Sequence, residues 1–451
     1  MKKWISIMMV LAMVITSLAG CGKNGEKAPV NSDVTKNEDS NQGNEKSKDD
    51  AKNSEEPITL KWAVWDINAT TYYQPLIDAY EAKNSNVKIE MIDLGSTDYM
   101  TVLATELTGN DSSIDIATIK DIPGYSTLVG KNALEPLTTY IENNKVDLSV
   151  YGGITDQILI NDNLYALPFR SDFWVVYYNK DIFDKAGVAY PTNDMTFEQY
   201  DALARSVTDT TFGSQVYGAH YHTWRSAVQL FGILDGKNTI VNGEYGFLKP
   251  YYELILGEQK DQVTQDYATL KTSSLHYSGA FAGGNVAMMN MGTWFISTII
   301  DKINTGEYSD ISNWGIVKYP HAEGVEPGST LATITSLAIT TASKQKEAAY
   351  DFLGFVCGSE GAEVIASTGT IPAIKTDAVI ASIASINGFP ADEQSAKALF
   401  TANTYLEMPV HANSSEIETI LNTAHDNIMS GNSTIDEGID YMNTEVQKLL
   451  K

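Results

Sequence analysis

The sequence predicts an α/β fold built on a parallel β-sheet and divided into two lobes or more. Three stretches, Ile58–Trp65, Val87–Ile92 and Ile114–Ile119, show the alternation or the apolar run typical of strands. Helical patterns separate them, and strands that alternate with helices favour a parallel sheet with right-handed crossovers. The chain after residue 56 is also too long for one ordinary hydrophobic core.

The first two crossover helices follow from apolar spacing. One is predicted by residues three and four positions apart, namely Tyr73, Leu76, Ile77 and Tyr80. The other spans Asp98–Gly109 and should stop at its glycine. The carboxyl edge of this sheet would carry Trp65-Asp66 after the first strand and Lys120-Asp121 after the third.

The start of the chain resembles the leader of an exported lipoprotein. Lys2 and Lys3 precede an apolar run, residues 4–19, which has the length of a secretory signal rather than a membrane span. Leu18-Ala19-Gly20-Cys21 resembles a lipobox. Residues 1–20 would then be removed, and Cys21 would carry a diacylglycerol and a further acyl chain such as palmitate. The alternative is an ordinary secretory signal that happens to contain a cysteine.

Residues 21–56 are predicted to be a disordered tether behind the lipidated Cys21. They are rich in Lys, Asp, Glu, Asn and Ser and have almost no large apolar residues. Such a segment cannot bury enough surface to offset its ordering entropy. The lipid would anchor the protein, and the tether would give it reach.

Charge and cysteine content exclude some partners. The formal net charge of −26 would repel nucleic-acid backbones and anionic lipid. The two cysteines are Cys21 and Cys357. With Cys21 lipidated no disulfide could form, and Cys357 lies on an apolar helical stripe, where it is expected to be a small core residue.

The stretch from residue 164 to residue 187 is the most informative part of the chain. Pro168 cannot donate to a sheet ladder and is expected to close a short strand. Phe173–Tyr178 is apolar on both faces, which indicates a buried strand. Asn179 should cap the helix that follows, and Gly187 should end it in the left-handed conformation.

Four residues lie between these two predicted strands: Phe169, Arg170, Ser171 and Asp172. They would stand at a strand end, where open α/β sheets hold their ligands. A second informative stretch is Phe281–Trp294, in which Gly283-Gly284 should turn into the strand Val286–Met289. Gly292 should then start a helix just before Trp294, whose indole would face a cleft; the alternative is core packing.

The remaining elements follow from the same patterns. His220–Trp224 is expected to be an aromatic turn, and Trp314–Val317 and Ala332–Thr340 to be strands. Helices are expected at Lys344–Val356 and Ser359–Ala366. Capping boxes should start three further helices, at Thr196 with Gln199, at Ser415 with Glu418 and at Thr434 with Glu437.

No catalytic motif is present. The sequence lacks G-x-S-x-G, H-E-x-x-H and the P-loop pattern. His220 and His222 form the one close histidine pair, and a local turn or a ligand contact is favoured there over zinc. No cofactor and no metal are therefore predicted. The many carboxylates leave a glycosidase-like pair open.

The predicted site is a binding site. Sugars need hydrogen-bonding partners for their hydroxyls and aromatic rings for their C–H faces. The candidate residues are Trp65, Asp66, Asp121, Phe169, Arg170, Asp172, Trp224 and Trp294. Each carboxylate alone could equally be a cap or a solvated loop residue. Trp174 is a further platform, but its place in an apolar strand favours the core.

Several of these stretches resemble one family. LYALP followed by YYNKDIFDKAG, then FAGGNVAMMNMGTW, then KEAAYDFLGFVCGSEG and GTIPA are similar to the extracellular solute-binding proteins of family 1, the sugar-type receptors of ABC importers. The likeness covers about residues 57–451. Phe197 departs from it, because the family often has Trp there, but that aromatic is expected to pack.

The resemblance implies a two-lobed, periplasmic-binding-protein-like α/β fold with hinge crossings and a central ligand cleft that closes on binding. The N-terminal lobe would hold residues 57–160 and 330–372, and the C-terminal lobe residues 161–329 and 373–451. Crossings are expected near Ile160, Thr330 and Pro372.

The resemblance also implies a function. The protein would be a monomeric lipoprotein, held by Cys21 on the outer face of the bacterial cytoplasmic membrane. It would capture a carbohydrate, with an oligosaccharide favoured, and deliver it to ABC permease subunits. It would not be an enzyme, would use no cofactor and would bind no nucleic acid. Three alternatives stay open: a surface-anchored carbohydrate-active enzyme, an adhesin, and a receptor of the same fold for a non-sugar solute, including a cationic one.

Overall fold

The computed structural model describes residues 57–451, except for residues 69, 97, 110–112, 212, 214 and 312. The signal peptide, the lipidated Cys21 and the tether predicted for residues 1–56 lie outside the described residues. In the described ranges, no helix is long and apolar enough to cross a membrane.

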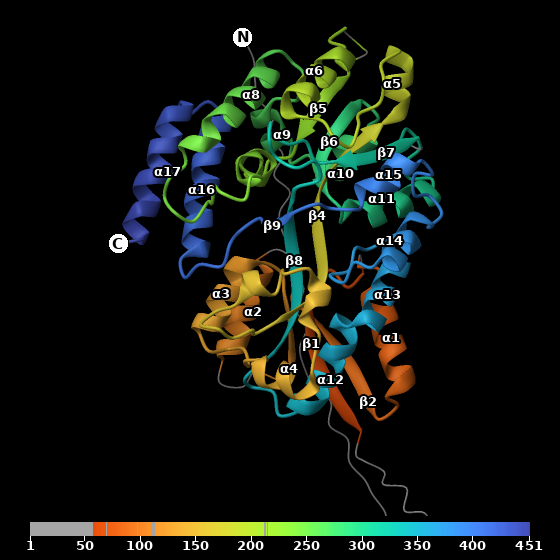
Figure 1. The fold of residues 1–451 in the computed structure, drawn as a ribbon, viewed down its shortest axis with the longest axis vertical. Helices are drawn as coiled ribbons and strands as arrows, with labels where there is room; N and C mark the ends of the chain where they lie inside the picture. Colours follow the sequence, from red (N-terminus) through yellow and green to blue (C-terminus); the bar gives the residue numbers. More distant parts are fainter. Residues whose placement is uncertain are drawn as a thin grey trace, which may run out of the picture. The chain divides into compact units, whose positions relative to one another are not determined.

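The N-terminal lobe is built around three parallel strands. β1 (Ile58–Val64) pairs in parallel with β2 (Val87–Asp93) on one side and β3 (Ile116–Ile119) on the other. The connecting helices are α1 (Tyr73–Lys83) and α2 (Tyr99–Thr108). The predicted strand–helix–strand–helix–strand unit is confirmed. Figure 1 shows this lobe with α3 (Ile122–Gly130), α4 (Thr138–Asn144) and α12 (Lys346–Cys357) around it.

The C-terminal lobe is built around β5 (Tyr217–Tyr221), β6 (Val286–Gly292) and β7 (Trp314–Lys318). β5 pairs in parallel with β6. Its first helices are α5 (Lys180–Ala186), α6 (Phe197–Val207), α7 (Ser226–Gln229), α8 (Lys249–Lys260), α9 (Tyr267–Ser273), α10 (Tyr277–Ala282) and α11 (Phe295–Asn304). This lobe also has short 3₁₀ helices at Leu230–Ile233 and Gly246–Leu248, and two more, Leu148–Tyr151 and Asp156–Ile158, precede β4 in the N-terminal part of the chain.

Two long strands run between the lobes. β4 (Leu167–Asn179) pairs along its first half with β8 (Thr330–Ile339) and along its second half with β6 and β7, all antiparallel. β8 also pairs antiparallel with β3, which gives the sheet order β2-β1-β3-β8-β4-β6-β5. Figure 1 shows β4 and β8 side by side in the middle of the fold. The chain also passes β4 near Pro372, where the Ala373 amide donates to the Phe169 carbonyl at 2.9 Å.

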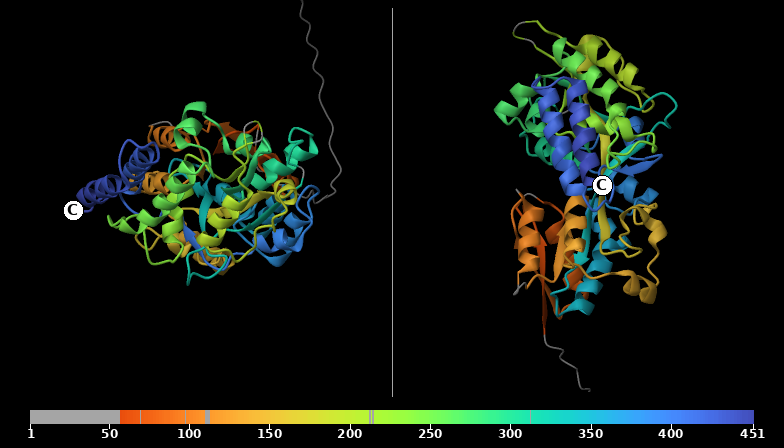
Figure 2. Two further views of the ribbon diagram at one scale, coloured as in Figure 1. Left: turned by 90° about the horizontal axis from the view of Figure 1, so that it is seen from above. Right: turned by 90° about the vertical axis from the view of Figure 1, so that its left-hand side faces the viewer.

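The rest of the chain covers both lobes. It forms α13 (Ser359–Ser367), α14 (Asp377–Ala384), α15 (Glu393–Ala398), β9 (Thr404–Leu406), α16 (Ser414–Met429) and α17 (Ile435–Leu449). β9 adds in parallel to the start of β8. Figures 1 and 2 show α16 and α17 packed side by side next to α8. The first turns of α16 also contact α3.

The structure corrects four local predictions. The strand does not end at Pro168: β4 passes through it, with a register shift between Pro168 and Arg170 that accommodates a residue without an N–H. Asp172 therefore lies in a strand and not in a loop. His220 belongs to β5 and not to a turn. Gly292 ends β6, and α11 begins only after Trp294.

Several caps are confirmed and one is wrong. Thr196 and Thr434 form the predicted capping boxes, and Gly187 ends α5 with a φ of 68°. The box predicted at Ser415 is absent from the described structure of α16, which begins at Ser414 after an N-cap Asn413 whose side chain makes no cap. The Glu418 carboxylate that would complete the box accepts a hydrogen bond from Arg225 instead.

The predicted burial of the central strand on both faces is confirmed. Phe173, Val175 and Tyr177 pack into one hydrophobic cluster, with α11 and α14. The alternate residues, including Trp174 and Val176, pack into the larger cluster that continues through the N-terminal lobe. Because a strand sends successive side chains to opposite faces, β4 contributes to both clusters. The backbone of β4 is therefore held in place where it passes from one lobe to the other.

Candidate functional site

A cavity of about 760 Å³ lies between the two lobes. The N-terminal lobe contributes residues that follow β1 and β3, and the C-terminal lobe contributes residues next to α7, α10 and α11. The carboxyl ends of parallel strands thus reach the cavity, as the strand-end rule predicts. Charged and aromatic residues of the lining are Trp65, Asp66, Tyr72, Lys120, Asp121, Arg170, Trp174, Trp224, Arg225, His276, Tyr277, Trp294, Glu407 and Glu418.

Three tryptophans form one wall of the cavity. The rings of Trp174 and Trp294 meet edge to face, with centroids 5.7 Å apart and an angle of 84°. Trp224 lies 6.2 Å from Trp294 and 5.7 Å from Tyr277. Trp224 is 39% exposed, which is unusual for so large an apolar side chain. The ring contacts hold the indoles at fixed angles, and the exposed part of Trp224 is open to a ligand.

Trp174 combines two roles that the sequence presented as alternatives. Its side chain is buried, with 1% of its surface exposed, yet it also lines the cavity. The indole N–H donates to Oε2 of Glu407 at 3.4 Å, and the same oxygen accepts a hydrogen bond of 2.9 Å from Thr333. Glu407, which also lines the cavity, therefore fixes the orientation of the tryptophan.

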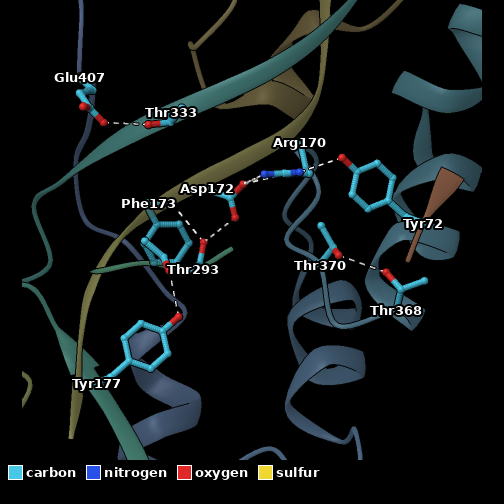
Figure 3. A network of polar contacts seen from close by, with 11 residues as sticks. Tyr72, Arg170, Asp172, Phe173, Tyr177, Thr293, Thr333, Thr368, Thr370 and Glu407 are labelled. Carbon is cyan, nitrogen blue, oxygen red and sulfur yellow. Dashed lines mark hydrogen bonds and ion pairs between the residues drawn. The ribbon is translucent and has the colours of Figure 1, made fainter. Parts of the chain in front are cut away.

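Arg170 is the centre of a polar network that reaches both lobes (Figure 3). Nε and Nη2 donate to Oδ2 of Asp172 at 2.8 and 2.6 Å, and Nη1 donates to the hydroxyl of Tyr72 at 2.8 Å. Oδ1 of Asp172 accepts from the Thr293 hydroxyl at 3.0 Å. Burial alone would lower the pKa of Arg170, but the Asp172 charge and Tyr72 outweigh it and raise that pKa. The guanidinium is thus held charged and in one orientation.

Lys120 and Asp121 extend the N-terminal side of the cavity. Nζ of Lys120 donates to the Ser96 carbonyl at 3.0 Å and lies 5.2 Å from the centroid of the Trp65 ring. Burial lowers the pKa of Lys120, against the opposing charges of Asp121 and Asp66. Asp121 caps α3 and accepts from the Gly124 amide at 2.7 Å.

Asp121 is a carboxylate under competing influences. Burial raises its pKa most strongly, and the nearby Glu418 carboxylate raises it further. The hydrogen bond from Gly124 and the charge of Lys120 act in the opposite direction, but the net shift of the Asp121 pKa is upward. Two like charges from α3 and α16 therefore face the same space.

Six of the eight predicted site residues line the cavity: Trp65, Asp66, Asp121, Arg170, Trp224 and Trp294. Phe169 and Asp172 are placed behind the lining, each with 1% of its surface exposed. Phe169 packs against Tyr72 at 5.9 Å, and Asp172 fixes Arg170. Contact of any of the eight with a ligand stays a prediction.

Sequence reasoning missed Arg225, Glu407 and Glu418. Arg225 could have been found, because it directly follows the predicted Trp224. The two glutamates gave no usable signal, since their partners Thr333 and Arg225 are 74 and 193 residues away in sequence.

The histidine pair is buried at the edge of the tryptophan wall. The ring of His222 meets Trp224 edge on, at 4.5 Å. Burial lowers the pKa of His222 to about 3 and that of His220 to about 4, so both rings are neutral at physiological pH. Within the described part of the chain, no three His, Cys, Asp or Glu residues are grouped so as to hold a metal ion.

Comparison with known proteins defines the family. The model of the bacterial extracellular solute-binding proteins matches residues 65–363. A sugar transporter from Rhizobium etli, solved in an open conformation, is 53% identical, with a TM-score of 0.80 over 86% of this chain and 99% of that one. A substrate-binding protein of Listeria monocytogenes in complex with cycloalternan is 21% identical, with a TM-score of 0.74 over 88% and 99%.

The mannitol-binding protein of Pseudomonas aeruginosa is 24% identical over 307 residues, which is 65% of this chain and 67% of that protein. The solved neighbours share the two-lobed fold, and the predicted fold class is confirmed. The chain belongs to the bacterial extracellular solute-binding proteins.

Proposed function

We propose that this protein is the sugar-binding subunit of an ABC importer, which captures a carbohydrate between its lobes and delivers it to a membrane permease. The observation that carries the proposal is the tryptophan wall facing fixed charged groups across a cavity of about 760 Å³. The 53% identity with a Rhizobium etli sugar transporter supports it.

The lining has the chemistry that a sugar needs. The C–H faces of a pyranose would stack on Trp224 and Trp294, and its hydroxyls would pair with Arg170, Asp66 and Asp121. Arg170 is suited to this role because Asp172 and Tyr72 already fix its orientation. Phe169 and Asp172 would position these contacts from behind.

An oligosaccharide is the favoured cargo. The cavity volume lies in the upper part of the range of about 300–1,000 Å³ that is typical of small-molecule sites. Relatives of the same fold were solved with mannotriose and with cycloalternan, and another with D-mannitol.

Closure of the lobes would couple binding to delivery. The proposed lobes are residues 57–160 with 330–372 and residues 161–329 with 373–451. A ligand that contacts both lobes favours the closed form in proportion to its differential affinity. The network from Tyr72 through Arg170 and Asp172 to Thr293 lies where the lobes would turn.

The proposal includes a lipid anchor. Residues 1–20 would be a signal peptide, Cys21 the lipidated residue and residues 22–56 a tether. A monomeric receptor would then stand on the outer face of the cytoplasmic membrane and hand its cargo on unchanged. Metabolic labelling with a palmitate analogue tests this part, since Cys21→Ser should abolish incorporation.

A thermal-shift panel tests the binding function. The full chain is screened against mannotriose, maltose, cycloalternan and D-mannitol, with amino acids, amines and peptides as controls. We expect a saturable rise of the unfolding temperature with one sugar class and recovery of that sugar unchanged. Conversion of the sugar would establish an enzyme. A rise of the unfolding temperature with the control solutes alone would support a receptor function but refute a sugar as the ligand.

A further inference from the structure

A smaller recess of about 130 Å³ adjoins the main cavity. Five residues line both spaces: Asp121, Arg225, Thr333, Glu407 and Glu418. The remaining lining is apolar and comes from the start of α3, from β8 and from Met408. The recess therefore combines polar groups on the side of the cavity with an apolar interior.

Arg225 carries the evidence for a ligand in this recess. Only 3% of its side chain is exposed. Nη2 donates to Oε1 of Glu418 at 3.0 Å, whereas Nε and Nη1 are buried and find no partner among the described residues. An unpaired buried donor is costly, and a guanidinium with five N–H groups can serve further acceptors. An acceptor atom of a ligand would meet this need.

The carboxylates around Arg225 define which acceptor can enter. Asp121, Glu407 and Glu418 bring three negative charges to the lining, against one positive charge from Arg225. The charge of Glu418 already raises the pKa of Asp121, in addition to the effect of burial. A ligand carboxylate or phosphate would add a fourth like charge in a poorly solvated space.

A hydroxyl group satisfies both sides. It accepts a hydrogen bond from Arg225 and donates its own hydrogen to a carboxylate oxygen. Two neighbouring hydroxyls would do this in parallel, because the guanidinium offers adjacent N–H groups. An ammonium group could donate to the carboxylates but has no acceptor for the unpaired N–H groups of Arg225.

We propose that this recess is the specificity subsite of the sugar site, and that it takes a neutral sugar end with two neighbouring hydroxyls and excludes sugar acids and sugar phosphates. The inference rests on the proposed function of the main cavity. It adds that Arg225 and Glu418 determine which sugars bind.

Calorimetric titration of the full chain tests the inference. The probes are mannotriose and maltotriose, each also with its C6 hydroxyls oxidised to carboxylates, and D-mannitol beside D-mannitol 1-phosphate. We expect the neutral member of a pair to bind at least tenfold more tightly. Arg225→Lys keeps the charge but loses the fork, and should weaken binding of the neutral sugar at least tenfold.

Glu418→Gln provides an independent variant, because the amide oxygen can still accept the hydrogen bond from Arg225 although the counter-charge is lost, so some loss of stability is expected. It should reduce the preference for the neutral sugar at least threefold. Arg205→Lys is the matched control: Arg205 pairs with Asp201 and Asp261 on the surface. It should change no dissociation constant, and thermal unfolding of each variant verifies the fold.

The outcomes separate the two proposals. If no sugar of the panel binds the unmodified protein, the proposed function is wrong and the subsite is wrong with it. If the neutral sugars bind but the acidic forms bind as tightly or more tightly, the subsite alone is refuted. The same holds if folded Arg225→Lys and Glu418→Gln both leave the affinities unchanged.

Discussion

Nη1 of Arg170 donates a hydrogen bond of 2.8 Å to the hydroxyl of Tyr72. This bond ties β4, the strand that crosses between the lobes, to the residue that precedes α1. Both side chains line the cavity, so a ligand that contacts either of them contacts the connection between the lobes.

Tyr72→Phe should therefore weaken sugar binding by about tenfold, or about 1.4 kcal/mol, because the guanidinium of Arg170 loses one of the hydrogen bonds that hold it in place for the sugar. Calorimetric titration with the sugar found in the panel measures the change. Tyr190→Phe is the control, since the Tyr190 hydroxyl donates to Asp184 on the surface. Equal affinities of the two variants would contradict a role for Tyr72 in the site.

Trp224→Ala should lower the affinity for the sugar by about tenfold, because a stacked sugar would lose its platform. The ring is 39% exposed, so the variant also loses the burial of the rest of the ring, and its unfolding temperature should fall. Tyr441→Ala removes an aromatic of similar exposure, 40%, from α17 and should leave the affinity intact. An unchanged affinity of Trp224→Ala would place the sugar elsewhere.

Asp172→Asn should lower the free energy of unfolding by roughly 3 kcal/mol, since it leaves the guanidinium of Arg170 without its buried counter-charge. Urea unfolding at pH 7 measures the loss. Asp201→Asn removes one of the two partners of a surface arginine, Arg205, and should cost less than about 1 kcal/mol. A similar cost for both variants would show that the Arg170–Asp172 pair contributes no more than a surface pair.

Lys375 should make the stability depend on alkaline pH. Burial lowers its pKa from 10.5 to about 8, only partly opposed by Asp172. Between these values the unfolded chain holds the proton and the folded chain does not, so the free energy of unfolding should rise with pH by up to about 3 kcal/mol. Below pH 8 both states are protonated, and the penalty of the buried charge is fully present.

The difference between the unmodified protein and Lys375→Met isolates this effect from the titration of tyrosines. Urea unfolding at pH 7.5 and pH 10 should show the variant to be the more stable at pH 7.5 and the difference to shrink at pH 10. A difference that is independent of pH would refute the lowered pKa. Nζ of Lys375 lies 4.4 Å from the centroid of the Phe173 ring, which places the amine next to β4.

The sequence was sufficient for what depends on local pattern. Apolar spacing predicts β1 to β3 and the helices between them, and the strand-end rule then places Trp65, Asp66 and Asp121 at one cavity. Trp224 and Trp294, which the sequence also predicts as site residues, line the same cavity.

The rest depends on contacts between distant segments. Ser415 and Glu418 have the spacing of a capping box, but the ion pair of Glu418 with Arg225 takes the carboxylate away from the helix start. Pro168 has the chemistry of a strand end, but β4 accommodates it with a register shift. Such outcomes are set by tertiary packing, which a local pattern does not contain.

The most direct test of the central claim is a crystal structure of the protein grown with mannotriose or with whichever panel sugar raises the unfolding temperature most. We predict one sugar chain between the two lobes, stacked on Trp224 and Trp294, hydrogen-bonded to Arg170 and with its neutral end at Arg225. A sugar bound outside the cavity, or a cavity that stays empty at saturating sugar, would contradict the account.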